Sequence, residues 1–226
     1  MTLMQTKQTK RGRKPSLSRD KIIEKTLALL NSSNPENFSI RRLAQELEVT
    51  PAAIYVYFSG QDELLKTAAE EVASRVELDK IPTDAPWRET LAAWAYAVRQ
   101  NHRTFPHATL MLKMSQHIPN AWFRVITPVW NVFGACECDE AKQIECTQSF
   151  IRGVAGLVLI EIQHDDSINV KAPREASKEV GNTDNANQTL AFDFISKLGT
   201  SDIDKLFEQS LDLLLDGIEL QLFKTN

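Results

Sequence analysis

The stretch SIRRLAQELEVTPAAIYVYF, residues 39–58, decides the fold of this chain. Ser39 and Thr50 are predicted helix N-caps, because a hydroxyl can accept a hydrogen bond from an otherwise unpaired backbone N–H. Pro51 then occupies a first helical position, where its missing N–H is no loss. Four apolar residues recur at helical spacing after the first cap, namely Ile40, Leu43, Ala44 and Leu47. The stretch therefore predicts a helix-turn-helix, a unit that places one helix in the DNA major groove.

Charge is distributed along the chain in a way that suits this motif. The whole chain carries a net charge of −4, which is unusual for a DNA-binding protein. Residues 1–66 hold 11 Lys and Arg against 7 Asp and Glu, a net +4, whereas residues 67–226 hold 15 against 23, a net −8. The basic surplus is thus confined to the end that carries the motif.

Part of that surplus forms a basic arm over residues 1–17, which is predicted to be disordered. It has no acidic residue and contains Lys7, Lys10, Arg11, Arg13 and Lys14. Taken alone, such an arm is a solvated tail. Beside a helix-turn-helix, contact of Arg13 and Lys14 with phosphates or the minor groove is the favoured interpretation.

Composition argues against several other classes of protein. The longest apolar run, 154–160, is far shorter than the ~20 residues of a membrane span. No apolar segment follows the basic N-terminus, so no signal peptide is expected. The chain has three cysteines, an odd number, and no export signal is expected. The thiols are therefore expected to be reduced, as they are in the cytoplasm.

Metal, cofactor and catalytic sites are not expected. Cys136, Cys138 and Cys146 have a spacing that matches no structural zinc pattern, so incidental or structural thiols are favoured over a metal or redox site. The sequence has no Gly-rich phosphate loop, no nucleophile elbow and no His–carboxylate pair at metal spacing. An enzyme is therefore the disfavoured alternative.

The remainder of the chain also predicts helices, and the expected fold class is all-α. Helices are expected over 18–30, 62–78, 87–103, 120–133, 139–163 and 202–222, in addition to the two of the motif. Asp139 and Asp202 are the predicted N-caps of the last two. Pro128 is expected to start or kink its helix. A broken Met-rich piece over 105–114 and a polar connection over 165–187 complete the chain.

The motif region resembles the TetR/AcrR family of transcriptional regulators. The resemblance rests on the pattern LAxxLxVTxxxIYxYF over 43–58, followed by ELL at 63–65, and it is specific over about 18–73. Beyond that it rests on helix number and length and on FIRGVAGL at 150–157. The resemblance implies a DNA-binding domain of three helices over 18–66 and a larger helical domain for ligand binding and dimerisation over 67–226. It also implies a homodimer that binds a palindromic operator and that a small molecule releases.

The resemblance assigns DNA contacts to particular residues. Arg41 matches a position that contacts a base or phosphate, and Tyr55 matches a tyrosine whose hydroxyl reaches a phosphate. The second helix of the motif is the recognition helix, which enters the DNA groove. Its first turn carries small side chains: Thr50, Pro51, Ala52 and Ala53. Tyr57 stands where histidine is commoner in the family. Ile54 and Phe58 are expected in the core instead.

Two residues depart from the family pattern. Glu48 occupies the turn position usually held by glycine, so it must adopt a strained backbone or reshape the turn. Gln61 stands where a phosphate-binding lysine is usual, and Lys66 or the N-terminal arm is expected to compensate.

The larger domain offers candidate walls for an apolar or aromatic ligand. They are Trp94, Phe105, His107, Met111, Met114, Trp122, Trp130 and Phe150. Aromatic residues at helical spacing are also what an ordinary core contains, and that alternative stays open. The dimer surface is expected on 139–163 and 202–222, including Leu214, with Gly153 and Gly156 permitting close helix approach.

The function predicted from the sequence is a DNA-binding regulator, by family resemblance a repressor, that works as a ligand-responsive homodimer in the cytoplasm. The rival is an architectural, nucleoid-type DNA-binding protein without a ligand. The large acidic, tryptophan-bearing domain disfavours that rival, because architectural binding depends on positive charge and not on an internal pocket.

Overall fold

The computed structural model describes residues 17–32, 38–106, 120–165 and 202–223. The predicted all-α class is confirmed, since every regular element in these ranges is helical. The helices are α1 (Arg19–Ser32), α2 (Ile40–Glu46), α3 (Pro51–Tyr55), α4 (Gln61–Ser74), α5 (Trp87–Thr104), α7 (Asn120–Gly134), α8 (Glu140–Asp165) and α11 (Ile203–Phe223), with a 3₁₀ turn, η2 (Leu78–Lys80), before α5. None of the described helices is long and apolar enough to cross a membrane.

The four predicted N-caps are confirmed by their hydrogen bonds. Ser39 Oγ accepts from the N–H of Arg42 at 3.2 Å, and Thr50 Oγ1 accepts from that of Ala53 at 3.4 Å. Asp139 and Asp202 each accept through Oδ1 at the starts of α8 and α11, at 2.8 and 3.0 Å. These side chains satisfy N–H groups that the first helical turn leaves without a partner.

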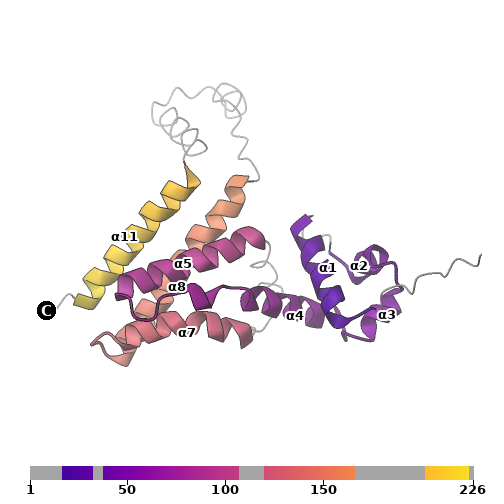
Figure 1. The fold of residues 1–226 in the computed structure, drawn as a ribbon, viewed down its shortest axis with the longest axis horizontal. Coiled ribbons are helices and arrows are strands. Elements are labelled where there is room, and N and C mark those ends of the chain that lie inside the picture. Colours follow the sequence, from indigo (N-terminus) through magenta and orange to yellow (C-terminus); the bar gives the residue numbers. More distant parts are fainter. Residues whose placement is uncertain (1–16, 33–37, 107–119, 166–201, 224–226) are drawn as a thin grey trace, which may run out of the picture.

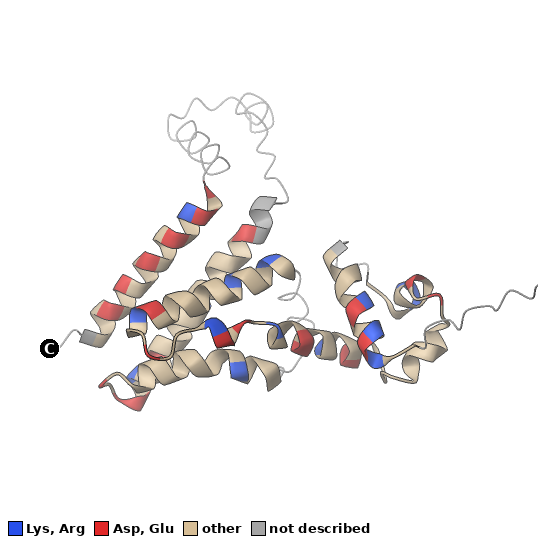
Figure 2. Ribbon diagram, in the orientation of Figure 1, with Lys and Arg blue, Asp and Glu red and all other residues tan. Residues whose placement is uncertain are grey.

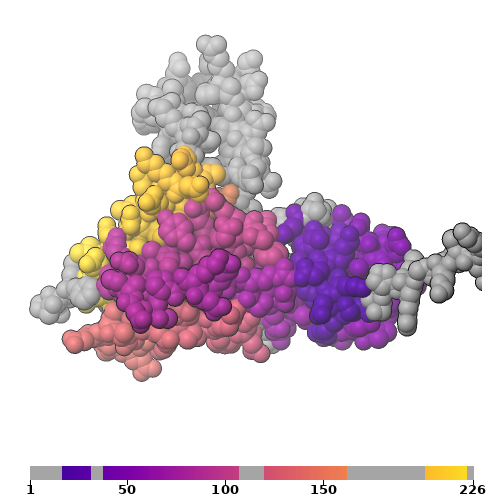
Figure 3. Space-filling view, in the orientation of Figure 1, coloured from indigo at the N-terminus to yellow at the C-terminus, as the bar shows by residue number. Residues whose placement is uncertain are grey.

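Two hydrophobic cores share one long helix. The first core joins α1 to α4 and includes the predicted core residues Ile54 and Phe58, both essentially inaccessible. The second core joins α5, α7, α8 and α11. Helix α4 contributes Val72 to the first and Ala73 to the second, so it physically connects the two units. In Figures 1 and 3 the unit of α1–α4 projects from one end of the larger helical body.

Two details differ from the sequence prediction. Helix α4 ends at Ser74, with Arg75 as its C-cap, instead of reaching residue 78. Helix α7 runs through Pro128 without a new start there, so of the two predicted effects of Pro128 the start is wrong and the kink stays a prediction. Pro128 deprives the carbonyl of Arg124, four residues earlier, of its usual donor. The predicted Met-rich piece and the polar connection over 165–187 lie almost wholly outside the described residues.

Helices α8 and α11 approach closely at one of the two predicted glycines. A Cβ atom on Gly153 would lie 2.6 Å from Cδ2 of Leu214, so the absence of a side chain there lets the helices meet within one chain. A Cβ atom on Gly156 would meet nothing within 4 Å. The two glycines therefore face different surroundings. Figure 2 shows acidic residues running the length of α11.

Candidate nucleic-acid interface

The residues of α2 and α3 that are predicted to face DNA are mostly exposed. Thr50, Pro51 and Ala52 are exposed and Ala53 is half-buried. Arg41 is exposed on α2, while its neighbour Arg42 is half-buried, which fits the choice of Arg41 as the groove-facing residue. The side chain of Tyr55 is 52% exposed. Lys66 is exposed on α4, and Arg13 and Lys14 lie outside the described residues.

Tyr57 has a partner inside the domain. Its hydroxyl donates a hydrogen bond to the carbonyl of Leu17 at 2.8 Å, and the ring packs against the first core. This bond ties the turn that follows α3 to Leu17, two residues before the start of α1. The structure thus gives Tyr57 a positioning role, and its contact with DNA stays a prediction.

The turn between α2 and α3 is built around Glu48. Its φ of 53° makes it the one non-glycine residue of the described chain in the left-handed region. The predicted strain at this family glycine position is therefore present. The N–H of Glu48 donates to Gln45 and that of Val49 to Ala44, at 3.1 and 3.0 Å. These bonds close the turn and set the direction in which α3 leaves α2.

Arg19 holds the other end of the recognition helix. Its guanidinium donates to the carbonyl of Tyr57 at 2.8 Å and lies 4.3 Å from the ring centroid of Phe58. It also donates to Glu63 Oε1 and Thr67 Oγ1 on α4, each at 3.2 Å. One planar group therefore joins the starts of α1 and α4 to the end of α3.

Glu63 completes this clamp. Its Oε2 accepts from both the N–H and the hydroxyl of Ser59, at 2.7 and 2.8 Å. The pKa of Glu63 lies below its ordinary value, first because the carboxylate accepts the Ser59 N–H and further because of the Ser59 hydroxyl and Arg19. Ser59 and Glu63 are four residues apart, so this part of the clamp is local in the sequence. Arg19, by contrast, had no local sequence signal.

The junction between the two units is polar and specific. Arg75, at the end of α4, pairs with Glu24 of α1 and lies 5.2 Å from the ring centroid of Phe105. Asn31 of α1 donates to the carbonyl of Thr104 at 2.8 Å. The end of α5 is thereby fastened to the unit that carries α3.

The predicted ligand-contacting residues are spread over several environments. Phe105 packs in the first core, beside α1–α4. Trp94 and Phe150 are buried in the second core with ring centroids 5.6 Å apart, and Trp94 Nε1 donates to Val125. Trp122 and Trp130 are half-buried, while His107, Met111 and Met114 lie outside the described residues. The core alternative thus describes the packing of Trp94 and Phe150, and their ligand contact stays a prediction.

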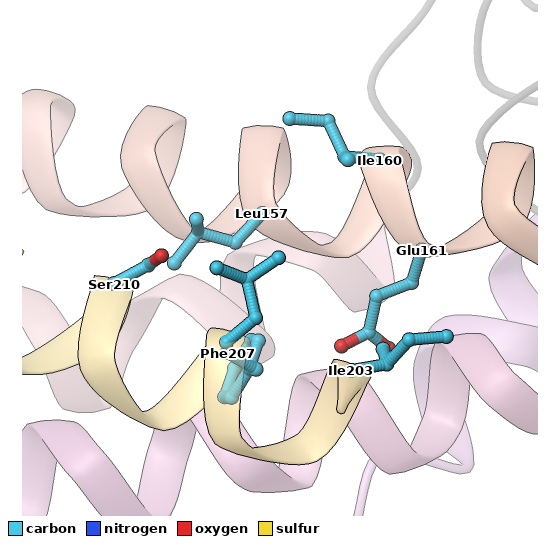
Figure 4. A pocket seen from close by; sticks show the side chains of 7 residues that line it. Leu157, Ile160, Glu161, Ile203, Phe207 and Ser210 are labelled. Atoms are coloured by element: carbon cyan, nitrogen blue, oxygen red, sulfur yellow. The ribbon is translucent and has the colours of Figure 1, made fainter. Parts of the chain in front are cut away.

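Two hollows lie elsewhere on the helical body. One, of about 110 Å³, lies between α8 and α11 and has mainly apolar walls, with Glu161 at one end and Ser210 at the other (Figure 4). The carboxylate of Glu161 accepts from Arg99 at 2.6 Å and from Arg103 at 3.3 Å, which ties α8 to α5. The other, of about 650 Å³, lies between the α4–α5 connection and α7. Neither contains a residue of the predicted ligand set.

The cysteines form no metal centre in the part of the chain that the structure describes. No group of three His, Cys, Asp or Glu side chains there is arranged to hold a metal ion. Burial raises the pKa of the Cys136 and Cys146 thiols, so both favour the protonated form.

Comparison with known proteins follows the same division of the chain. Residues 22–68, which span most of α1–α4, match the family described as bacterial regulatory proteins, tetR family. The HTH-type transcriptional repressor DrrR1 of Streptomyces coeruleorubidus is 30% identical over 109 residues, covering 48% of this chain and only 39% of that relative. The tetracycline repressor protein class C of Escherichia coli is 26% identical over 220 residues, covering 93% of this chain and 94% of the relative.

A solved structure has the same fold over nearly the whole chain. The Streptomyces coelicolor TetR family protein ActR, in complex with actinorhodin, superposes with a TM-score of 0.71 at 18% identity, covering 92% of this chain and 100% of ActR. These matches are to regulatory proteins and not to enzymes. The capped helices, the turn at Glu48 and the aromatic end of α3 all lie inside the matched segment. The chain is thus similar to the TetR family of bacterial regulatory proteins, through the family match at residues 22–68 and a 26% identical relative over most of its length.

Proposed function

We propose that this protein is a transcription regulator, a repressor in its basal state, that reads DNA with α2 and α3. The observation that carries the proposal is the exposed, small first turn of α3, together with Arg41 exposed on α2 and Tyr55 exposed at the end of α3. Small side chains let the helix backbone approach the groove, and the two flanking side chains supply hydrogen bonds to bases or phosphates. Arg19 and Glu63 hold this surface in one orientation.

The proposed regulator acts as a homodimer formed through α8 and α11. The outward face of α11 carries a stripe at alternating spacings of four and three residues: Leu206, Ser210, Leu213, Gly217 and Leu220. Its three leucines are 39%, 72% and 57% exposed. This spacing is that of a coiled-coil seam, and the same stripe on a second copy is a self-complementary partner. Leu214, the residue first expected here, packs against Gly153 within the chain instead.

Release by a small apolar or aromatic ligand completes the proposal. Helix α4 belongs to both cores, and Arg75 and Asn31 fasten the DNA-reading unit to α5. A movement within the helical body is therefore transmitted to α3. A ligand shifts DNA binding only if it binds the released arrangement more tightly than the DNA-bound one. That ActR is a family structure with a bound small molecule supports this part.

The proposal is tested by selecting bound sequences from a random DNA pool with the full chain. A palindromic consensus supports a sequence-reading dimer, whereas an unenriched pool favours the architectural alternative. On the selected site, Arg41→Ala is expected to weaken binding by about 1–3 kcal/mol if Arg41 reads a base. Lys80→Ala, which removes an exposed positive charge on η2, is the matched control and should leave affinity unchanged. An equal loss for Arg41→Ala on selected and random DNA would show that Arg41 contacts only phosphate.

A further inference from the structure

Val56, at the end of α3, exposes more of its side chain than any other large apolar residue that the structure describes. Its exposed fraction is 80%, against 72% for Leu213 of the proposed dimer stripe. Val56 is the C-cap of α3 and keeps a helical backbone, with φ −67° and ψ −28°. It therefore continues the helix that is proposed to enter the DNA groove. In Figure 1 this helix lies at the end of the molecule remote from α11.

Val56 shares an exposed face of α3 with Ala52. Residues four apart in a helix lie on the same face, and both of these side chains are exposed. Ile54, two residues from each of them, lies on the opposite side and is completely buried in the first core. The outward face of α3 is therefore small and apolar, and Val56 is the larger of these two side chains.

The side chains of α3 offer few hydrogen bonds to the edges of bases. Between Thr50 and Val56, only Thr50 and Tyr55 have a polar side chain, and each carries a single hydroxyl. Thr50 Oγ1 already accepts from the N–H of Ala53 at 3.4 Å. The bidentate pairs that identify guanine or adenine need Arg, Lys, Asn or Gln, and α3 has none of these. Apolar contact is thus the direct readout that suits this face.

The backbone around Val56 is fixed by its neighbour, Tyr57. The N–H of Tyr57 donates to the carbonyl of Ile54 at 2.9 Å, and its own carbonyl accepts from Arg19 at 2.8 Å. The Tyr57 hydroxyl donates to the carbonyl of Leu17. Valine is also branched at Cβ, which restricts its χ1 angle. Val56 therefore presents its two methyl groups in a defined place, and little side-chain entropy is lost when a base packs on them.

We propose that Val56 reads the C5-methyl group of a thymine in the major groove and so helps to determine the sequence of each half-site. Thymine is the base that presents a methyl group in that groove. The contact removes this methyl group and the valine side chain from water, which favours thymine over a base without the methyl group. This inference rests on the proposed function, because it names the base feature that α3 reads.

The test uses the full chain and the DNA site selected from the random pool. Each thymine of one half-site is replaced in turn by deoxyuridine, which lacks only the C5-methyl group. At one position the replacement should weaken binding about three- to fivefold, as expected for one buried methyl group. Val56→Ala should nearly abolish this difference at the same position, whereas Val56→Ile should keep it. Val56→Ala should also leave the salt dependence of binding unchanged, because no phosphate contact is lost.

The matched control is Tyr55→Phe, which alters the neighbouring exposed side chain and leaves Val56 in place. This variant should keep the difference between thymine and deoxyuridine, whatever affinity it loses. The inference is overturned if no thymine of the half-site responds to loss of its methyl group, if Val56→Ala leaves the response unchanged, or if Tyr55→Phe abolishes it equally. A pool that yields no selected site would refute the proposed function, and this inference with it.

Discussion

Replacing Glu48 by glycine is predicted to stabilise the protein. Glu48 has a φ of 53°, a region in which the Cβ of an L-residue crowds the following carbonyl. That conformation costs roughly 1–2 kcal/mol for a residue other than glycine. Glycine removes this strain but gains about 0.5–1 kcal/mol of unfolded-state entropy. The balance is a net stabilisation of about 0.5–1 kcal/mol.

Glu48→Ala isolates the backbone contribution. Both variants lose the carboxylate and its interactions, but alanine keeps the Cβ that causes the strain. The free energy of unfolding, from urea titrations of the full chain, should therefore be about 1 kcal/mol higher for Glu48→Gly than for Glu48→Ala. For a chain of this size the midpoint temperature should differ by about 2–4 °C. Equal stability of the two variants would refute strain at this turn.

Three further predictions concern the clamp and the helical body. In urea titrations, the free energy of unfolding of Gly153→Ala should be about 1–2 kcal/mol lower than that of Gly156→Ala, because only a Cβ at position 153 would meet Leu214, at 2.6 Å. Equal free energies of unfolding for the two variants would contradict the close approach of α8 and α11. The pKa of Glu63 is lowered from 4.5 in the folded state, so its stabilising effect is present above that value and is lost as pH falls below it. The Glu63→Gln variant should therefore lose less stability than the unsubstituted protein as the pH is lowered from 6 to 3. If the melting temperatures of the two proteins fell by the same amount over that range, the Ser59–Glu63–Arg19 clamp would be contradicted. Leu213→Glu should give monomers in sedimentation, since Leu213 is 72% exposed on the proposed dimer stripe, whereas a persistent dimer would place the interface elsewhere.

Local chemistry made the secondary structure predictable. Ser39, Thr50, Asp139 and Asp202 each began a helix, because an N-cap depends on residues within one turn of the chain. The strain at Glu48 was equally local. Helix ends were less predictable, as the early end of α4 at Ser74 shows, since they depend on what packs beyond them.

Contacts between distant segments could not be predicted in the same way. Arg19 meets Glu63 across 44 residues, and nothing near Arg19 in the sequence indicates that partner. Phe105 looks like any other aromatic of the helical body, yet it packs with α1–α4. Leu213 and Leu214 are adjacent and chemically identical, and only the packing at Gly153 decides which faces outward.

Hydroxyl-radical footprinting on the selected DNA tests the central claim most directly. If α2 and α3 of two copies read DNA together, protection should fall on two half-sites about one helical turn apart, or a multiple of it, and Arg41→Ala should reduce it at both. Uniform protection along the duplex, unchanged by Arg41→Ala, would contradict a sequence-reading dimer.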